Sequence, residues 1–233
     1  MLKIRMITVI LLCMFSVALF AETTFAQKMV SREDVVKRMK NSQTYFTETV
    51  SDSETAIPKA ILQKASGFVV LRQLKLGFIV GATGGGGFAM VKDEESGAWS
   101  PPAFVETGEL SFGLQIGVKG ANAIYVVMTK ESMEKILKGG LKIGADISAQ
   151  VGPLGKDVEV DLQKTPEVFI YSKNKGLYTG ATFKAASFKE DKAANEAFYG
   201  KNVSAKDILF NKAVEMPEEA GSFVEFLTGC YMM

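Results

Sequence analysis

The sequence predicts an α+β fold. In it, a mostly antiparallel β-sheet of about seven or more strands, curled or barrel-like, carries N- and C-terminal helices packed on it. Two observations predict this class. Apolar residues recur about every 3.6 positions near both ends of the chain and at every second position through its middle. No proline- or serine-rich linker divides the 233 residues, so the helices and strands are expected to share one domain.

Residues 1–26 have the layout of a secretory signal peptide. Lys3 and Arg5 precede the apolar run ITVILLCMFSVALF, and small residues follow at Ala21 and Ala26. The alternative is a retained membrane anchor, for which this run is short against the ~20 residues that span a bilayer. We therefore expect export, with the processed chain in the periplasm or outside the cell and peripherally associated with a membrane.

Residues 27–56 are predicted to form an N-terminal helical segment. Ser31 places a capping hydroxyl ahead of a carboxylate three residues later and of recurring apolar residues. This pattern predicts a helix from about Ser31 to Thr47. A second, short helix is expected to begin at Pro58, where a missing N–H is tolerated, and to end at Gly67.

The middle of the chain is a run of predicted strands with turn residues between them. The expected strands are GFVVLRQ (67–73), KLGFIVGA (75–82), GFAMVKD (87–93), ELSFGLQIGVK (109–119), NAIYVVMT (122–129), LKIGADISAQVG (141–152) and LYTGATFKAASF (177–188). Glycine at alternate strand positions indicates that another backbone or a helix approaches closely. The sheet face is therefore expected to be covered or curled.

Helices are expected again in the second half. A short one is predicted around Glu131 to Lys138, between strands. The C-terminal quarter then contains FKEDKAANEAF, a segment beginning at Ser204 with a carboxylate at its third helical position, and a segment beginning at Pro217.

The most unusual motif is GATGGGG, with glycines at Gly81, Gly84, Gly85, Gly86 and Gly87. A nucleotide P-loop needs a lysine after its last glycine, and here Gly87 and Phe88 follow Gly86. The dinucleotide pattern G-x-G-x-x-A is met by Gly84, Gly86 and Ala89, yet no helix can follow before the charged turn at Asp93. We expect a structural glycine loop between two buried strands, or a nest of backbone N–H groups that holds an anion.

Composition excludes several chemistries. The chain has no histidine, and Cys230 is the only cysteine left once residues 1–26 are removed. Catalytic triads, histidine-based zinc sites and internal disulfides are therefore excluded. We expect no enzyme activity, no metal and no cofactor. Removal of residues 1–26 also leaves 25 basic and 25 acidic residues, so no net field points to nucleic acid.

Three blocks together resemble the SYLF domain family, the lipid-binding or actin-binding domain of a fungal actin-patch protein. They are IPKAILQKASGFVVLRQLKLGFIVGATGGGGFAMV (57–91), WSPPAFVETGELSFGLQIG (99–117) and NEAFYGKNVSAKDILF (195–210). The resemblance implies a SYLF-like lipid-binding domain over residues 57–233. It also implies phosphoinositide-like headgroups as ligands, as in eukaryotic members, some of which bind actin filaments. Members often carry a basic residue at the glycine stretch, and this chain does not.

Charge gives an independent indication of a membrane partner. Between Lys28 and Lys75 there are nine basic residues against five acidic ones, and each basic residue near an anionic surface contributes ~1 kcal/mol to binding. The candidate lipid-binding residues are Lys28, Arg32, Lys37, Arg38, Lys40, Lys59, Lys64, Arg72 and Lys75. The first helix is expected either to pack its apolar stripe on the core or to lie in the membrane interface.

Two functions remain open from the sequence. The first is a non-enzymatic protein that binds an anionic phospholipid membrane. The second is a structural or protein-interaction module of the cell envelope, whose glycine-rich strand face binds a protein partner or a second copy of the chain.

Overall fold

The computed structural model describes residues 30–52, 56–77, 80–112, 117–139, 142–155, 158–161, 164–172 and 187–232. Apart from Val30, these residues belong to one compact unit, Ser31–Met233. The helices of the described part are α2 (Arg32–Ser51), α3 (Lys59–Lys64), α4 (Lys130–Lys138), α6 (Lys192–Tyr199), α7 (Ala205–Phe210) and α8 (Glu218–Met232). The strands are β1 (Gly67–Gly77), β2 (Val80–Val91), β3 (Ala103–Phe112), β4 (Gly117–Val127), β5 (Ala149–Val151), β6 (Val168–Tyr171) and β7 (Phe188–Glu190).

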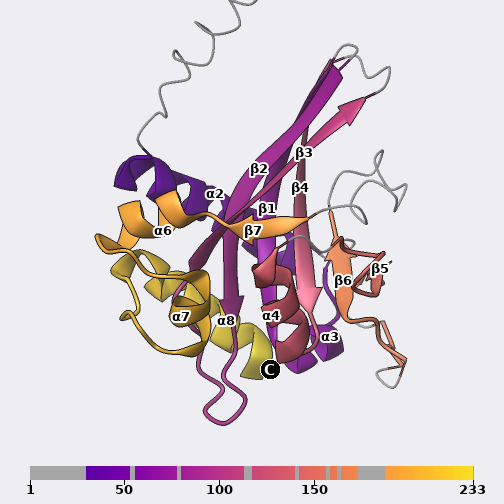
Figure 1. The fold of residues 1–233 in the computed structure, drawn as a ribbon. Coiled ribbons are helices and arrows are strands. Elements are labelled where there is room, and N and C mark those ends of the chain that lie inside the picture. Colours follow the sequence, from indigo (N-terminus) through magenta and orange to yellow (C-terminus); the bar gives the residue numbers. More distant parts are fainter. Residues whose placement is uncertain are drawn as a thin grey trace, which may run out of the picture. The chain divides into compact units, whose positions relative to one another are not determined.

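The strands form one sheet in the order β5-β6-β4-β1-β2-β3-β7. All neighbours are antiparallel except β5 and β6, which run parallel. The four long strands β1 to β4 form the centre of the sheet (Figure 1). The predicted α+β class and antiparallel sheet are thus confirmed. The described strands leave β5 and β7 as two separate edges, so they do not close into the barrel-like form that the sequence allowed.

Each face of the sheet carries its own hydrophobic core. On one face, Met133 of α4 and Ile208 of α7 pack on Val69, Tyr125 and their neighbours. On the other face, α2, α3, α6 and α8 cover strand residues such as Phe68 and Phe88. The alternation along each strand supplies both cores, because successive side chains point to opposite faces. The sheet face is therefore covered by helices, as its glycines predicted.

The two serine N-caps read from the sequence are confirmed. The Ser31 hydroxyl accepts a hydrogen bond from the Asp34 N–H, and the Ser204 hydroxyl accepts one from Asp207. Pro58 is the N-cap of α3, which ends three residues before Gly67 instead of at it. Helix α2 extends past Thr47 to Ser51, since its buried residues continue through Thr49.

Several strand boundaries differ from the prediction. GFVVLRQ and the start of KLGFIVGA form the single strand β1, while the end of KLGFIVGA belongs to β2, which pairs antiparallel with β1. LKIGADISAQVG contains a turn at residues 144–146, so only its end is strand, as β5. β6 was not predicted, because VFIY is buried on both faces and shows no alternation. β7 lies where a helix was expected, and most of LYTGATFKAASF lies outside the described residues.

The glycine stretch was predicted as a loop, and this is wrong. Gly81 and Gly84 to Gly87 lie inside β2, with register partners on β1 and β3 on either side. Glycine is needed at Gly87 because a Cβ there would collide with the Val70 carbonyl of β1. At Gly84 a Cβ would meet no atom within 4 Å. The stretch is therefore a strand along which the neighbouring backbone approaches closely at one point.

Candidate functional site

Helix α2 crosses the sheet with its apolar stripe facing inward. Val35, Met39 and Phe46 are at most 1% exposed and belong to the core on that face. Of the two arrangements expected for this helix, packing on the core is the one found, and the stripe is not free to enter a membrane interface. What α2 presents to solvent is its polar side, which carries Lys37 and Lys40.

A cavity of about 230 Å³ lies between α2 and the sheet. Three of the predicted basic residues line it: Lys37 and Arg38 from α2 and Arg72 from β1. The rest of the lining is mixed, with polar side chains such as Ser42 and Asn122 and the apolar residues Val70 and Leu71 of β1. Sequence spacing alone could not reveal this convergence, because Arg72 reaches the cavity only once α2 has folded over β1.

The strand register explains how the floor of the cavity forms. Asn122 on β4, Arg72 on β1 and Gly86 on β2 are direct partners across three strands. Direct partners share one face of a sheet, and here it is the face that α2 covers. Because Gly86 has no side chain, this row has a gap, and the Arg38 guanidinium lies over it: Nη1 is 2.5 Å from where a Gly86 Cβ would be.

Arg38 is held from two further directions. Its Nη2 donates to Asp191 Oδ2 at 2.9 Å, and its guanidinium carbon lies 5.5 Å from the centre of the Phe104 ring. Asp191 also caps α6, since Oδ1 accepts from the Ala194 N–H at 3.0 Å. Sequence reasoning missed Asp191: its position before a helix signals a cap, but nothing signals its pairing with Arg38.

The cavity has more cationic than anionic groups. Asp34 is the single carboxylate in its lining, and Asp34 Oδ2 already accepts from the Ser31 hydroxyl at 2.9 Å. Within the described part of the chain, neither Lys37 nor Arg72 is in an ion pair. Two unpaired cations beside an oriented guanidinium favour an anionic ligand.

The other predicted basic residues do not line this cavity. Arg32 connects α2 to the C-terminal helices, because it donates hydrogen bonds to Glu219 Oε1, at 2.6 Å, and to the Phe198 carbonyl. Lys40 lines a second, more open cavity of about 470 Å³ between α2 and α8. Lys59 and Lys64 are exposed on α3. Lys28 lies outside the described residues, as does the side chain of Lys75 in β1.

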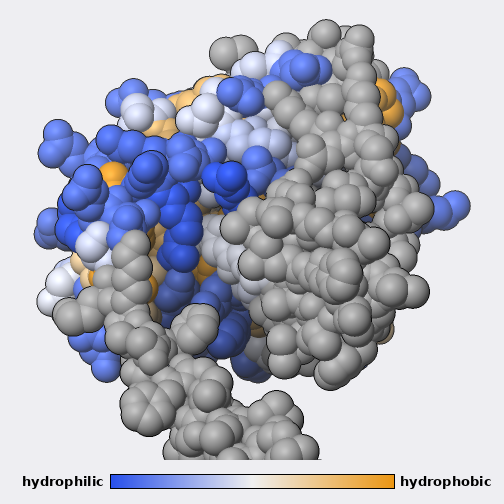
Figure 2. Space-filling view, turned by 90° about the horizontal axis from the view of Figure 1, so that it is seen from above, coloured by the Kyte–Doolittle hydropathy of each residue, from blue (hydrophilic) through white to orange (hydrophobic). Residues whose placement is uncertain are grey.

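Figure 2 shows the face of the molecule that carries α2 and α6 on its left side, seen from above. The described surface there is mainly hydrophilic, with small apolar patches between the polar side chains. No helix among the described residues is both long and apolar enough to cross a membrane. The described residues also contain no cluster of carboxylate or cysteine ligands that could hold a metal ion.

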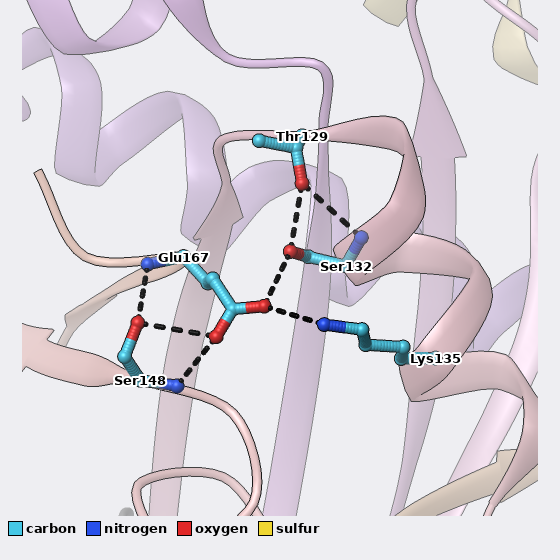
Figure 3. Close-up of polar contacts among 5 residues, drawn as sticks. All are labelled: Thr129, Ser132, Lys135, Ser148 and Glu167. Carbon is cyan, nitrogen blue, oxygen red and sulfur yellow. Dashed lines mark hydrogen bonds and ion pairs between the residues drawn. The ribbon is translucent and has the colours of Figure 1, made fainter.

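A second polar cluster is centred on Glu167, just before β6 (Figure 3). Its carboxylate accepts from Ser148 N–H at 2.9 Å, from the Ser132 hydroxyl at 3.1 Å and from Lys135 Nζ at 3.0 Å. These donors, led by the Ser148 backbone, lower the pKa of Glu167 to about 2. Ser132 is 1% exposed and also bonds to Thr129, the N-cap of α4. This cluster joins α4 to β5 and β6, and its groups are used in these contacts.

The fold is an α+β domain, in which an N-terminal helix lies over a cationic cavity on a glycine-containing sheet. A sequence model of the Ysc84 family, described as "Las17-binding protein actin regulator", matches residues 108–230. The chain belongs to this family, whose domain is the SYLF domain that the three sequence blocks indicated.

Relatives in animals and yeast extend the match toward the N-terminus. The "SH3 domain-containing YSC84-like protein 1" of Rattus norvegicus is 34% identical over 187 residues, 78% of this chain and 54% of the relative. Its Homo sapiens counterpart is 33% identical over the same shares. "Protein YSC84" of Saccharomyces cerevisiae is 28% identical over 183 residues, 76% of this chain and 39% of the relative. The chain thus spans about half the length of the animal relatives. No solved structure matches it.

Proposed function

We propose that this protein is a non-enzymatic phospholipid-binding protein of the SYLF type, which attaches peripherally to anionic membranes. The observation that carries the proposal is the convergence of Lys37, Arg38 and Arg72 on one cavity. Attachment would be electrostatic, because the apolar stripe of α2 is buried. The signal-like residues 1–26 support a further part of the proposal, that the protein acts in the cell envelope or outside the cell.

Vesicle flotation tests this proposal. The chain from Gln27 onward, which contains the whole compact unit, is mixed with phosphatidylcholine vesicles with and without anionic lipid. We expect flotation with the anionic vesicles only, and weaker flotation as salt is added, because exposed charges are screened. No flotation with anionic vesicles at low salt would overturn the proposal.

A matched pair of variants localises the binding surface. Replacing Lys37 and Arg72 by glutamine removes two charges worth ~1 kcal/mol each, so affinity should fall by roughly 30-fold. The control replaces Lys138 and Lys206, which are exposed on α4 and α7 on the opposite side of the sheet. Equal losses in both double variants would mean that binding depends on net charge and not on this cavity.

A second function, protein binding, is favoured by the family description, which names Las17 binding and actin regulation. For this chain we propose an envelope partner or a second copy of itself. The glycine-rich strand offers little room for either partner at Gly86, where Arg38 of α2 approaches, or at Gly87, where the β1 backbone approaches, and it is open at Gly84. Pull-down from detergent-cleared envelope extract separates the two functions, because a partner retained without lipid supports this one.

A further inference from the structure

We propose that the cavity under α2 is a subsite for one phosphate ester group, and that Gly86 and Asp191 are positioning residues that fix the Arg38 guanidinium in it. This inference rests on the proposed membrane function and makes it specific. The inference specifies which anion the cavity recognises. Charge attraction alone would give similar affinity for all anionic surfaces.

The first argument is that Arg38 is oriented before any ligand arrives. Asp191 binds Nη2, Phe104 lies beside the guanidinium, and the missing side chain at Gly86 provides the space in which Nη1 lies. A flexible surface arginine loses rotamer freedom when it binds, whereas a fixed one does not. These contacts therefore fix the position of the Arg38 guanidinium, so that its free N–H groups point in a set direction before a ligand binds.

The second argument concerns the donors that remain. Among the described residues, Nη1 has no hydrogen-bond partner, while Nη2 donates to Asp191. Arg72 stands next to Gly86 in the strand register, and Lys37 lines the same cavity. Guanidinium groups match the oxygens of a phosphate in pairs, and a lysine adds a point charge. Two guanidinium groups and one ammonium suit a dianionic phosphomonoester better than a phosphodiester, which carries a single charge.

The third argument is that the site is compact. A cavity of about 230 Å³, with cationic side chains and the apolar residues Val70 and Leu71 in its lining, accommodates one small anionic group and is too small for an acyl chain. Ser42 and Asn122 supply neutral polar side chains in the lining, and Asp34 is engaged by Ser31. The ligand class is therefore a phosphate ester, carried by a lipid headgroup or present as a free phosphate.

The experiment compares Gly86→Ala with Gly84→Ala. An added methyl at Gly86 would displace the Arg38 guanidinium, the end of a flexible side chain, whereas at Gly84 it meets open space. Both proteins are floated with phosphatidylcholine vesicles containing either phosphatidic acid, a monoester, or phosphatidylglycerol, a diester, at equal total charge. We expect the unmodified protein and Gly84→Ala to prefer phosphatidic acid by about tenfold, the effect of ~1.4 kcal/mol. Gly86→Ala should lose the preference while still binding both vesicles.

Asp191→Asn provides a second variant in case Gly86→Ala does not fold. It keeps a side-chain oxygen for the α6 cap but removes the charge that holds Arg38, and it should reduce the same preference. Unchanged preference in folded Gly86→Ala and Asp191→Asn would overturn the inference. Failure of the unmodified protein to bind either vesicle would instead overturn the proposed function, so the two failures are distinguishable.

Titration with inorganic phosphate distinguishes the two sources of the ligand. Phosphate binding in solution that Gly86→Ala weakens assigns the cavity to the free anion. A preference seen only on vesicles, with no phosphate binding in solution, assigns it to a lipid headgroup. Either result supports the subsite, whereas equal phosphate binding by the unmodified protein and Gly86→Ala counts against it.

Discussion

Arg38 and Asp191 are 153 positions apart in the chain, yet Nη2 of the arginine donates to Oδ2 of the aspartate at 2.9 Å. The pair links the first described helix to the N-terminus of α6 on the face of the sheet that both helices cover. The Asp191 side chain is only 10% exposed, so its charge is largely removed from water. Its two oxygens serve two partners, Arg38 and the Ala194 N–H. Asp191 therefore both caps α6 and holds Arg38 at the cationic cavity.

Asp191→Ala should therefore lower the free energy of unfolding more than the loss of a cap alone. The cap is worth ~1 kcal/mol, and leaving a partly buried partner unpaired adds about 1–3 kcal/mol. Urea denaturation measures the sum. Ser204→Ala is the control, because it removes the cap of α7 from a residue with no cationic partner in the described structure. Equal decreases in the free energy of unfolding in the two variants would contradict this double role of Asp191.

The glycines of β2 should differ sharply in their tolerance of alanine. Gly87→Ala places a methyl against the Val70 carbonyl, a backbone atom that cannot turn aside, and should cost about 3 kcal/mol or more. Gly84→Ala meets open space and should be neutral or stabilise by roughly 0.5–1 kcal/mol, because it restricts the unfolded chain. Thermal unfolding of both variants checks this contrast. Similar melting temperatures would mean that the strands separate at Gly87 more readily than their register indicates.

Stability should decrease in acid because of Glu167. Its pKa is about 2 in the folded chain, mainly because of the Ser148 N–H, and ~4.3 for an unfolded glutamate. The ionised carboxylate thus stabilises the fold fully above about pH 4.5, and this contribution is lost as the pH falls toward 2. Glu167→Gln should remove this part of the pH dependence and cost about 1–3 kcal/mol at neutral pH. Denaturation curves at several pH values measure both effects. An unchanged pH profile in Glu167→Gln would contradict the prediction.

Tyr125→Phe should not destabilise the protein. The Tyr125 hydroxyl is fully buried and has no hydrogen-bond partner among the described residues, and burial raises its pKa. Removing an unsatisfied buried hydroxyl is neutral or stabilising, by about 1 kcal/mol at most. The ring contact to Phe188, at 4.8 Å between centroids, is retained in the variant. A large loss in calorimetry would instead indicate that the hydroxyl binds a buried water.

Local patterns were sufficient to predict much of this fold. The caps at Ser31 and Ser204 and the helix before Gly139 depend on neighbours in the sequence, and the structure confirms them. The alternating segments were predicted less well: ELSFGLQIGVK is divided between β3 and β4, and only the end of LKIGADISAQVG is strand. VFIY escaped detection because a strand buried on both faces has no alternation to read. The sequence predicts a loop at the glycine stretch because glycine destabilises a strand unless another backbone or side chain packs closely against it. At Gly86 that group is Arg38, which is far away in the sequence.

The candidate site was predictable only in part. Counting charges selected Lys37, Arg38 and Arg72, but it selected Arg32, Lys59 and Lys64 with equal weight. The difference arises from tertiary structure: Arg32 is used to anchor a helix, while Arg38 lies over a gap in a row of strand residues. Asp191 and Phe104, which hold Arg38, have no local signal that links them to α2.

The position of Phe223 in α8 has a consequence for the order of folding. Its ring completes the aromatic cluster with Phe46, Phe68 and Phe88, at centroid distances of 5.5, 6.0 and 5.8 Å. All three partners precede Phe223 in the sequence, so they are synthesised before it. The core on this face therefore lacks one of its rings until α8 has been made, and helix α2 cannot complete its packing before then.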